Sequence, residues 1–185
     1  MVARVIILKG DKVSLGILSR EDAPELFRMI NNPKVSIFLR FPRRIIGLVD
    51  EYEWIDNNSN VVGKSHHFGI IENKSDKIVG VTGVEDIEAM TNAHVGYFID
   101  EEQWGNGFAS EALKLVVYYS FNILNIRKLY THVYEPNKAS RRVLEKNGFQ
   151  NTGVQKEHHF IEGRGYTDAL YFELLNPARQ KISNL

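Results

Sequence analysis

The feature that most constrains the fold is a change of apolar period near the middle of the chain. Residues 93–100, AHVGYFID, read as a β-strand, whereas the apolar residues of the next segment recur at helical spacing: Phe108, Ala112, Leu115, Val116 and Tyr119. Between them lies Asn106-Gly107, the pair most typical of a tight β-hairpin turn. A segment with helical period cannot return as the second strand of a hairpin. The sequence therefore predicts a strand, a short loop and a helix.

The remaining segments predict a mixed α/β chain. Helices are expected over 19–32, from about residue 49 onward, and over 135–149, where Asn137 is the expected N-cap. An irregular segment is expected over 34–48, and further strands over 11–18, 66–72, 77–86, 128–134 and on both sides of a turn at 162–165. The strands at 93–100 and 128–134 flank the central helix as one β-α-β crossover. We expect a single domain over residues 1–185.

Composition excludes several classes of function. Lys and Arg together number 23, as do Asp and Glu, so the zero formal charge gives no whole-molecule attraction to nucleic acid or membranes. The absence of cysteine excludes disulfides, thiolate metal sites and a cysteine nucleophile. The apolar run VIIL near the N-terminus is too short for a signal peptide or a membrane span. We therefore expect a cytoplasmic protein that binds neither nucleic acid nor membranes.

The predicted loop between strand and helix has the residues of an anion site. Gly105 and Gly107 leave room for close approach, and the N–H groups and dipole at a helix N-terminus favour a pyrophosphate. The loop lacks the Walker pattern. It fits the dinucleotide-binding fingerprint G-x-G-x-x-G/A poorly, because Ser110 stands where the third Gly or Ala belongs. A turn that serves only packing explains the glycines as well.

Two stretches in sequence order resemble the GNAT N-acetyltransferases. The first, GYFIDEEQWGNGFASEAL, contains a loop similar to the family pattern [RQ]-x-x-G-x-[GA], with Trp104 in place of Arg or Gln. The second, YTHVYEPNKASRRVLEKNGF, matches the family's coenzyme-side helix from Asn137 onward. The forms W-G-x-G-x-A-x-E-A and N-x-x-S-x-x-V-L-E-K-x-G-F look like the branch that acetylates the N-termini of ribosomal proteins. The resemblance covers roughly residues 10–175.

The resemblance implies the GNAT fold, a mostly antiparallel sheet that splays between the strands at 93–100 and 128–134 and binds acetyl-CoA in the opening. The loop would hold the pyrophosphate, the strand before it the acetyl carbonyl, and Asn137 the pantetheine arm. A basic residue of the helix over 135–149 could meet the 3′-phosphate of the coenzyme. The coenzyme residues expected in this way are Phe98, Ile99, Trp104, Gly105, Asn106, Gly107, Phe108, Ala109, Ser110, Asn137, Ser140 and Arg142.

The implied reaction is direct transfer of acetyl from the thioester to a primary amine, with no acyl-enzyme and no metal. The first-choice acceptor is the N-terminal α-amine of a protein or peptide. An α-amine titrates near about 7.7–8.0 and needs less help from a base than a lysine near about 10.4. A small amine (polyamine, amino acid or aminoglycoside) is the second choice, and a non-catalytic acyl-CoA-binding module is the alternative outside enzymology. A monomer or homodimer is expected.

Three residues are candidate catalytic groups. Many GNAT enzymes protonate the leaving thiolate with a tyrosine at the position of Leu144, and the branch suggests Ser140 as the substitute. The branch also places a carboxylate base on the strand before the last turn, where this sequence has His159, with Glu157 two residues earlier on the same strand face. An imidazole pKa near about 6.5 suits this role. Ordinary packing explains Ser140 and His159 nearly as well.

Further polar clusters leave open alternatives. Glu85 and Asp86 are second candidates for the base, and the acidic residues of the helix from residue 49 could attract a cationic acceptor or simply face solvent: Asp50, Glu51, Glu53 and Asp56. The pairs His66-His67 and His158-His159 are not expected to bind a metal, because adjacent strand residues point to opposite faces.

Overall fold

A computed structural model describes residues 4–39, 45–59 and 61–178. Its centre is a sheet in the order β1-β2-β3-β4-β5-β6-β8-β7, in which neighbours are antiparallel except for β5 and β6. The strands are β1 (Ile6–Lys9), β2 (Val13–Gly16), β3 (His66–Glu72), β4 (Ile78–Glu88), β5 (Asn92–Ile99), β6 (Lys128–Tyr134), β7 (Gln150–Ile161) and β8 (Gly165–Leu175). This arrangement confirms the predicted mixed sheet with one parallel crossover.

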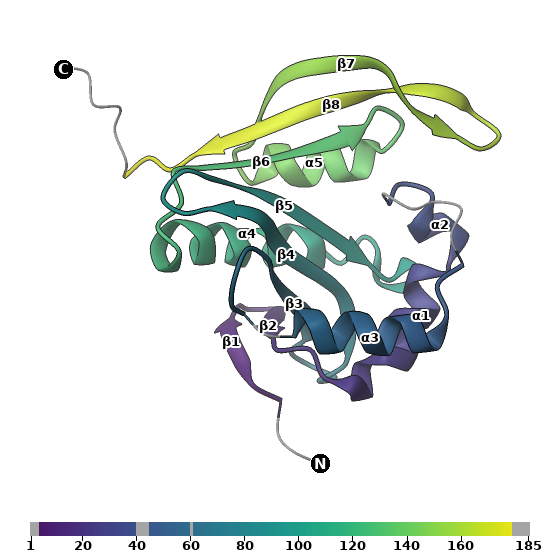
Figure 1. Cartoon of the computed structure of the whole chain (residues 1–185), viewed down its shortest axis with the longest axis vertical. Coiled ribbons are helices and arrows are strands. Elements are labelled where there is room, and N and C mark those ends of the chain that lie inside the picture. The colour runs from purple at the N-terminus through teal and green to yellow at the C-terminus, as the bar shows by residue number, and fades with distance from the viewer. Residues whose placement is uncertain (1–3, 40–44, 60, 179–185) are drawn as a thin grey trace.

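The sheet splays between β5 and β6. These strands pair at only three positions, Asn92–Lys128, Ala93–Leu129 and His94–Tyr130. Beyond them β5 continues along β4 and β6 along β8, so the two strands diverge toward their C-terminal ends (Figure 1). The opening lies where the sequence predicts it.

The segment after Asn106-Gly107 is a helix, as its apolar period predicts. Helix α4 (Phe108–Tyr118) crosses the sheet and ends in a π-helical turn over Tyr119–Ile123. Helix α5 (Lys138–Lys146) follows β6. Its predicted N-cap is confirmed, because the Asn137 side-chain oxygen accepts a hydrogen bond from the Ser140 N–H at 3.1 Å.

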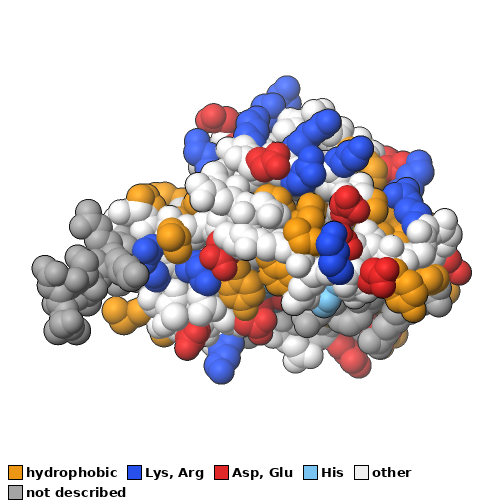
Figure 2. Space-filling view, turned by 90° about the horizontal axis from the view of Figure 1, so that it is seen from above, with side chains coloured by type: hydrophobic (Ala, Val, Ile, Leu, Met, Phe, Trp, Pro, Cys, Tyr) orange, Lys and Arg blue, Asp and Glu red, His pale blue; other side chains and the backbone are white. Residues whose placement is uncertain are grey.

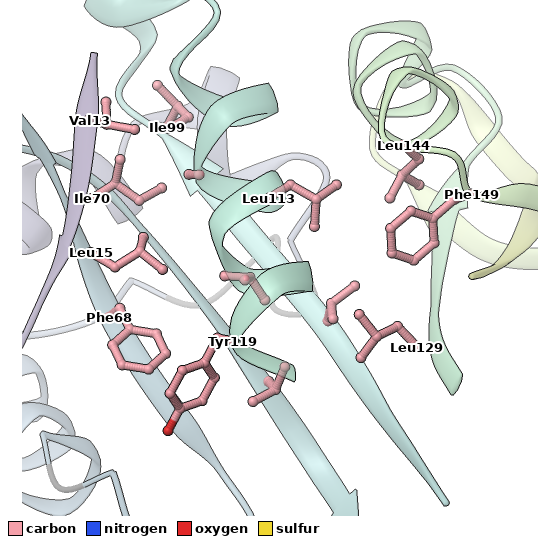
Figure 3. Packing of buried hydrophobic residues seen from close by; sticks show 14 of the residues in the cluster. Val13, Leu15, Phe68, Ile70, Ile99, Leu113, Tyr119, Leu129, Leu144 and Phe149 are labelled. Carbon is pink, nitrogen blue, oxygen red and sulfur yellow. The ribbon is translucent and has the colours of Figure 1, made fainter. Parts of the chain in front are cut away.

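Helices cover both faces of the sheet. On one face, α4 lies between apolar side chains of β2 and β3 and those of α5, and Leu113 and Leu144 belong to the same buried cluster as Phe68 (Figure 3). The other face is covered by α1 (Ala23–Ile30) and α3 (Leu48–Asn58), which share a second cluster with the sheet. No helix in the described ranges is long and apolar enough to span a membrane.

The N-terminal part departs from the predicted segments. The apolar run near the N-terminus forms β1, which pairs with β2 and was not expected as a strand. Its sequence, IILK, shows no alternation of apolar and polar residues. The helix expected over 19–32 is a 3-10 turn followed by α1, and the short helix α2 (Pro33–Ser36) lies at the start of the segment expected to be irregular. Asn32 caps α2, and proline suits its first position. Residues 40–44 of that segment lie outside the described residues.

Helix α3 buries a carboxylate. Glu51 is 4% exposed, and its carboxylate forms no hydrogen bond or ion pair with the described residues. Burial raises the pKa of Glu51 to about 7. Its neighbours in the predicted acidic face have ordinary roles, because Asp50 accepts a hydrogen bond from the Gly47 N–H and Asp56 pairs with Arg20.

The substitution Glu51→Gln tests this burial. A folded-state pKa above the unfolded value near about 4.5 makes stability fall as pH rises from there through 7. Glutamine carries no charge, so we expect the variant to exceed wild type in unfolding free energy by about 1–3 kcal/mol at pH 8, and by much less at pH 5. Denaturant unfolding at both pH values measures this. Asp56→Asn, on the exposed side of α3, should show no such pH-dependent gain, and an equal gain from Glu51→Gln at both pH values would contradict the account.

Candidate active site

Two glycines with left-handed backbone shape the loop between β5 and α4. Gly105 has a φ of +83° and Gly107 a φ of +84°, in the region that favours glycine. Gly107 directly precedes the first residue of α4. The chain therefore requires glycine at both positions to turn from the strand into the helix.

The backbone donors of this loop are free. The N–H groups of residues 105–110 donate to no acceptor in the described part of the chain, and the first helical bond runs from the Glu111 N–H to the Gly107 carbonyl at 3.1 Å. Unpaired N–H groups at a helix N-terminus, with the helix dipole behind them, form an anion site. The loop thus has the donors that the sequence predicts for a pyrophosphate.

Trp104, which departs from the family pattern, anchors the loop. Its indole Nε1–H donates to the Ile99 carbonyl at 2.9 Å, while about half of the side chain stays exposed (51%). The carbonyl at the end of β5 would otherwise lack a partner at the edge of the opening. The indole thereby fixes the loop to the strand before it.

Lys12 is a basic residue at the loop that sequence reasoning missed. Its Nζ donates to the Asn106 carbonyl at 3.0 Å, and its backbone N–H donates to Glu111 Oε1 at 2.9 Å. The ammonium lies 3.5 Å from where a Cβ on Gly107 would stand. No local pattern could reveal this contact, because 94 residues separate Lys12 from Asn106 and only the packing of α4 beside β2 joins them.

The second motif packs against the first. Asn147, at the end of α5, donates from Nδ2 to Ser110 Oγ in the first turn of α4 at 3.3 Å. Arg142 lies exposed on α5, while Leu144 is 1% exposed and belongs to the core. Among the basic residues of α5, Arg141 pairs with Glu145 one turn later. The structure thus joins the two sequence motifs at one end of the opening.

One wall of the opening is the free edge of β5. The Asp100 N–H donates to the Val79 carbonyl of β4, and N–H directions alternate along a strand. The N–H groups of Ile99 and Tyr97 therefore face the opening, where they have no partner among the described residues. Phe98 faces β4 with its backbone, since its carbonyl oxygen would lie 2.2 Å from a Cβ on Gly80. Of the two expected strand contacts, Ile99 has its amide available for an acetyl carbonyl.

The other wall is the start of α5. Ser140 Oγ lies 2.9 Å from the hydroxyl of Tyr97, which reaches across from β5. Burial raises the pKa of Tyr97 to about 12, although the contact with Ser140 works in the opposite direction. Asn137 and Ser140 therefore lie together at the first turn of α5, opposite the free edge of β5. Tyr97 was not among the predicted site residues.

His159 lies near the open end of the sheet. Its ring stacks on that of Tyr134, the last residue of β6, with ring centroids 4.0 Å apart. Burial lowers the pKa of His159, and His158 lowers it further. Its Nε2 is buried and has no hydrogen-bond partner among the described residues. A neutral imidazole with a free ring nitrogen is chemically able to accept a proton.

The prediction that Glu157 shares a strand face with His159 does not hold. Gln155 pairs with Ala169 and His159 with Thr167, so β7 carries extra residues in a bulge. Glu157 has a φ of +50°, is exposed, and donates its backbone N–H to Asp168. Simple alternation fails across such a bulge. It also fails for His158 and His159, which both contact rings on one face of β6, those of His132 and Tyr134.

On the face covered by α1 and α3, a carboxylate lies between two imidazoles. Glu85 of β4 is 3.8 Å from His67 Nε2 and 3.6 Å from His94 Nδ1. His94 belongs to the last residue pair before β5 and β6 separate. The second candidate base thus lies beside the start of the opening. Asp86 has a φ of +50° at an irregular point of β4.

The segment around α2 spans the open end. Asn32 Nδ2 donates to Glu101 just after β5 at 2.9 Å, and Lys34 also pairs with Glu101. The residues that follow α2, Ile37 and Phe38, pack with Tyr134 at the end of β6. This segment therefore connects the two strand ends that the splay separates, and it borders the side from which an acceptor could approach.

The described residues give no sign of a metal centre, and the face drawn in Figure 2 is not uniformly basic. The described residues contain no group of three or more His, Asp and Glu side chains placed to hold a metal ion. His66 contacts Tyr119 and His67 contacts Trp54, on opposite faces as predicted. The face in Figure 2 mixes acidic side chains among its Lys and Arg residues and exposes apolar side chains through its middle.

The residues over 13–150 match the acetyltransferase (GNAT) domain family. The chain belongs to the GNAT acetyltransferase family. A relative named uncharacterized N-acetyltransferase p20, from Bacillus licheniformis, is 27% identical over 91% of this chain and 95% of its own. Family membership confirms the predicted class of enzyme, an N-acetyltransferase, for which acetyl-CoA is the implied donor.

Solved structures share the GNAT fold. The ribosomal L7/L12 α-N-protein acetyltransferase RimL, solved with coenzyme A, has a TM-score of 0.82 at 21% identity, over 94% of this chain and 99% of its own. Spermidine N-acetyltransferase from Vibrio cholerae, solved with coenzyme A and spermine, has a TM-score of 0.80 at 24% identity, over 90% and 97%. These likenesses confirm the predicted fold of the GNAT domain.

Proposed function

We propose that this GNAT enzyme binds acetyl-CoA between β5 and β6 and transfers the acetyl group directly to the N-terminal α-amine of a protein or peptide. The observation that carries the proposal is the opening itself. Strand pairing stops after His94–Tyr130, and free N–H groups line both the edge of β5 and the loop before α4. These unpaired N–H groups can donate to a ligand, and a thioester arm with its pyrophosphate supplies matching acceptors.

In the proposed reaction the neutral amine attacks the thioester carbonyl carbon. The Ile99 N–H faces the place where negative charge develops on the carbonyl oxygen. The C–S bond then breaks and its electron pair goes to sulfur, beside the Ser140 hydroxyl. The amine loses one proton and the thiolate gains one, so the products are an amide and the free coenzyme thiol.

The proposed base is His159. Its lowered pKa favours the neutral imidazole, and its Nε2 is buried in the free protein with no hydrogen-bond partner among the described residues. Such a weak base deprotonates an α-ammonium, near about 7.7–8.0, far more readily than a lysine or polyamine ammonium near about 10.4. This difference favours an α-amine as the acceptor. Glu157, exposed in the bulge, is the less suited of the two predicted groups.

A small polyamine is the second candidate acceptor. Glu85 presents a carboxylate between His67 and His94 next to the opening, which suits a cationic chain. The spermidine N-acetyltransferase from Vibrio cholerae was solved with coenzyme A and spermine. RimL, in contrast, is named as an acetyltransferase of ribosomal L7/L12. Both acceptor classes therefore occur among chains of this fold. A single domain over 1–185, a monomer or homodimer, and a cytoplasmic location stay predictions.

A panel of amines tests the function. Wild-type protein is incubated with acetyl-CoA and one amine at a time, and thiol release and product mass are followed. The panel contains three acceptors. The first is a peptide with a free N-terminus and no lysine, and the second is a version of it that is blocked at its N-terminus and carries one internal lysine. The third is spermidine. We expect turnover with the free N-terminus and little with the blocked peptide. Faster turnover of spermidine would support the second acceptor class. Coenzyme binding without turnover of any amine would leave only a binding module.

Substituting Gly107 tests the loop. In Gly107→Val, a branched side chain must adopt a φ near +84° beside Lys12 and the free N–H groups. We expect acetyl-CoA affinity to fall roughly tenfold or more, measured by calorimetric titration, because strain and bulk displace the donors. Gly163→Val places the same strain in the β7–β8 turn, with open space around it, and is the matched control. Unchanged affinity in Gly107→Val would remove the loop assignment.

Lys12 is expected to supply positive charge to the same anion. We expect Lys12→Gln to weaken acetyl-CoA binding roughly threefold to tenfold at low salt, and to reduce the salt dependence of affinity. Titrations at two salt concentrations measure both effects. Lys156→Gln, at an exposed lysine that pairs with Asp168, controls for a general loss of charge. If the two variants bind equally well, Lys12 has no part in the site.

A further inference from the structure

Tyr97 of β5 and Ser140 of α5 form a polar contact between the two walls of the opening. The Tyr97 hydroxyl, from β5, lies 2.9 Å from Ser140 Oγ and 3.3 Å from the Ser140 carbonyl oxygen, both on α5. The first distance is normal for a hydroxyl–hydroxyl hydrogen bond, whereas the second is long. The Tyr97–Ser140 hydroxyl pair is therefore the main polar link across this part of the splay.

Either hydroxyl of the Tyr97–Ser140 pair could be the donor, and we take the phenol as the donor because it is the stronger acid of the two. Its burial favours the neutral phenol, and the raised pKa keeps the proton in place over the whole range in which such an enzyme works. A neutral phenol has one proton to donate, and Ser140 Oγ is the acceptor at the better distance. When Tyr97 donates to Ser140 Oγ, the O–H of Ser140 does not have to donate to Tyr97. It is then available to donate a hydrogen bond to another acceptor.

The surroundings of Ser140 restrict which other group could take this role. Its backbone N–H is held by Asn137, which fixes the first turn of α5. Leu144 stands one turn later on the same face of α5 and has no donor. Ser140 therefore offers a hydroxyl donor where Leu144 offers none, and it is only half-buried, so a ligand in the opening can reach it.

We propose that Tyr97 is a positioning residue that orients the Ser140 hydroxyl toward the thioester sulfur. The inference rests on the proposed function. As the amine nitrogen forms its bond to the carbonyl carbon and the C–S bond breaks, the electron pair moves to sulfur, where the Ser140 O–H stabilises the growing charge. Neither Tyr97 nor Ser140 loses its proton. The thiolate takes up the proton that the amine has released through the base and water.

A double-mutant cycle tests this arrangement. Wild type, Tyr97→Phe, Ser140→Ala and the double variant are compared for kcat with the best amine of the panel and for acetyl-CoA affinity by titration. We expect Tyr97→Phe to lower kcat roughly tenfold and Ser140→Ala by at least as much, with affinity within about twofold of wild type. Because Tyr97 acts through Ser140, the double variant should be no slower than Ser140→Ala alone.

Tyr119→Phe is the matched control. Tyr119 is a buried tyrosine, whereas Tyr97 is partly buried, and the Tyr119 hydroxyl lies 2.8 Å from His66 Nδ1, away from the opening. Tyr119→Phe also removes one hydroxyl hydrogen bond, so the unfolding temperature should shift similarly in both tyrosine variants. We expect kcat to fall only for Tyr97→Phe. The phenyl ring keeps its packing in each, and we expect both variants to fold.

Two results would overturn the proposal. Unchanged kcat in Tyr97→Phe would show that the hydroxyl has no part in transfer. Multiplied effects in the double variant, roughly a hundredfold against tenfold for each single change, would show that Tyr97 acts independently of Ser140. Failure of the proposed function is separate, since wild type would then acetylate no amine of the panel and the inference would fall with it.

Discussion

The interruption of pairing between β5 and β6 is the constraint on which the rest of the structure depends. Three residue pairs join these strands, and beyond His94–Tyr130 each strand follows a different neighbour. A half-buried strand edge with unpaired N–H groups is costly unless something fills it. The chain closes the gap on one side with α5 and spans its open end with the segment around α2. The remaining space faces a backbone edge that is ready to bind a ligand.

Polar links hold the end of β5 in place. Asp100 pairs with Arg28 of α1, and Glu101 contacts Asn32 and Lys34. Asp100 is 3% exposed, whereas the Arg28 side chain is 44% exposed, so the carboxylate is buried at the strand end and its partner reaches it from the surface. The loop that follows is then fixed by Trp104 and Lys12. Helix α1, the segment around α2 and the loop before α4 are therefore all attached to the end of β5.

Local sequence patterns predicted the parts of this site that arise from local physics. The change of period after Gly107 predicted α4, and Asn137 predicted the start of α5, since period and capping depend on neighbours along the chain. Lys12 beside Asn106 and Tyr97 beside Ser140 could not be predicted, because each contact joins residues far apart in sequence. The bulge at Glu157 overturned the face assignment for a different reason. Alternation is reliable only where pairing is regular, and nothing in the local composition marked the extra residues.

The central claim is that the opening between β5 and β6 is the coenzyme site. A crystal structure of the protein with acetyl-CoA tests it most directly. The account predicts pyrophosphate oxygens within hydrogen-bond distance of the backbone N–H groups of residues 105–110, the pantetheine arm between β5 and α5, and the sulfur beside Ser140. Acetyl-CoA bound elsewhere on the chain, with the loop donors unoccupied, would contradict it.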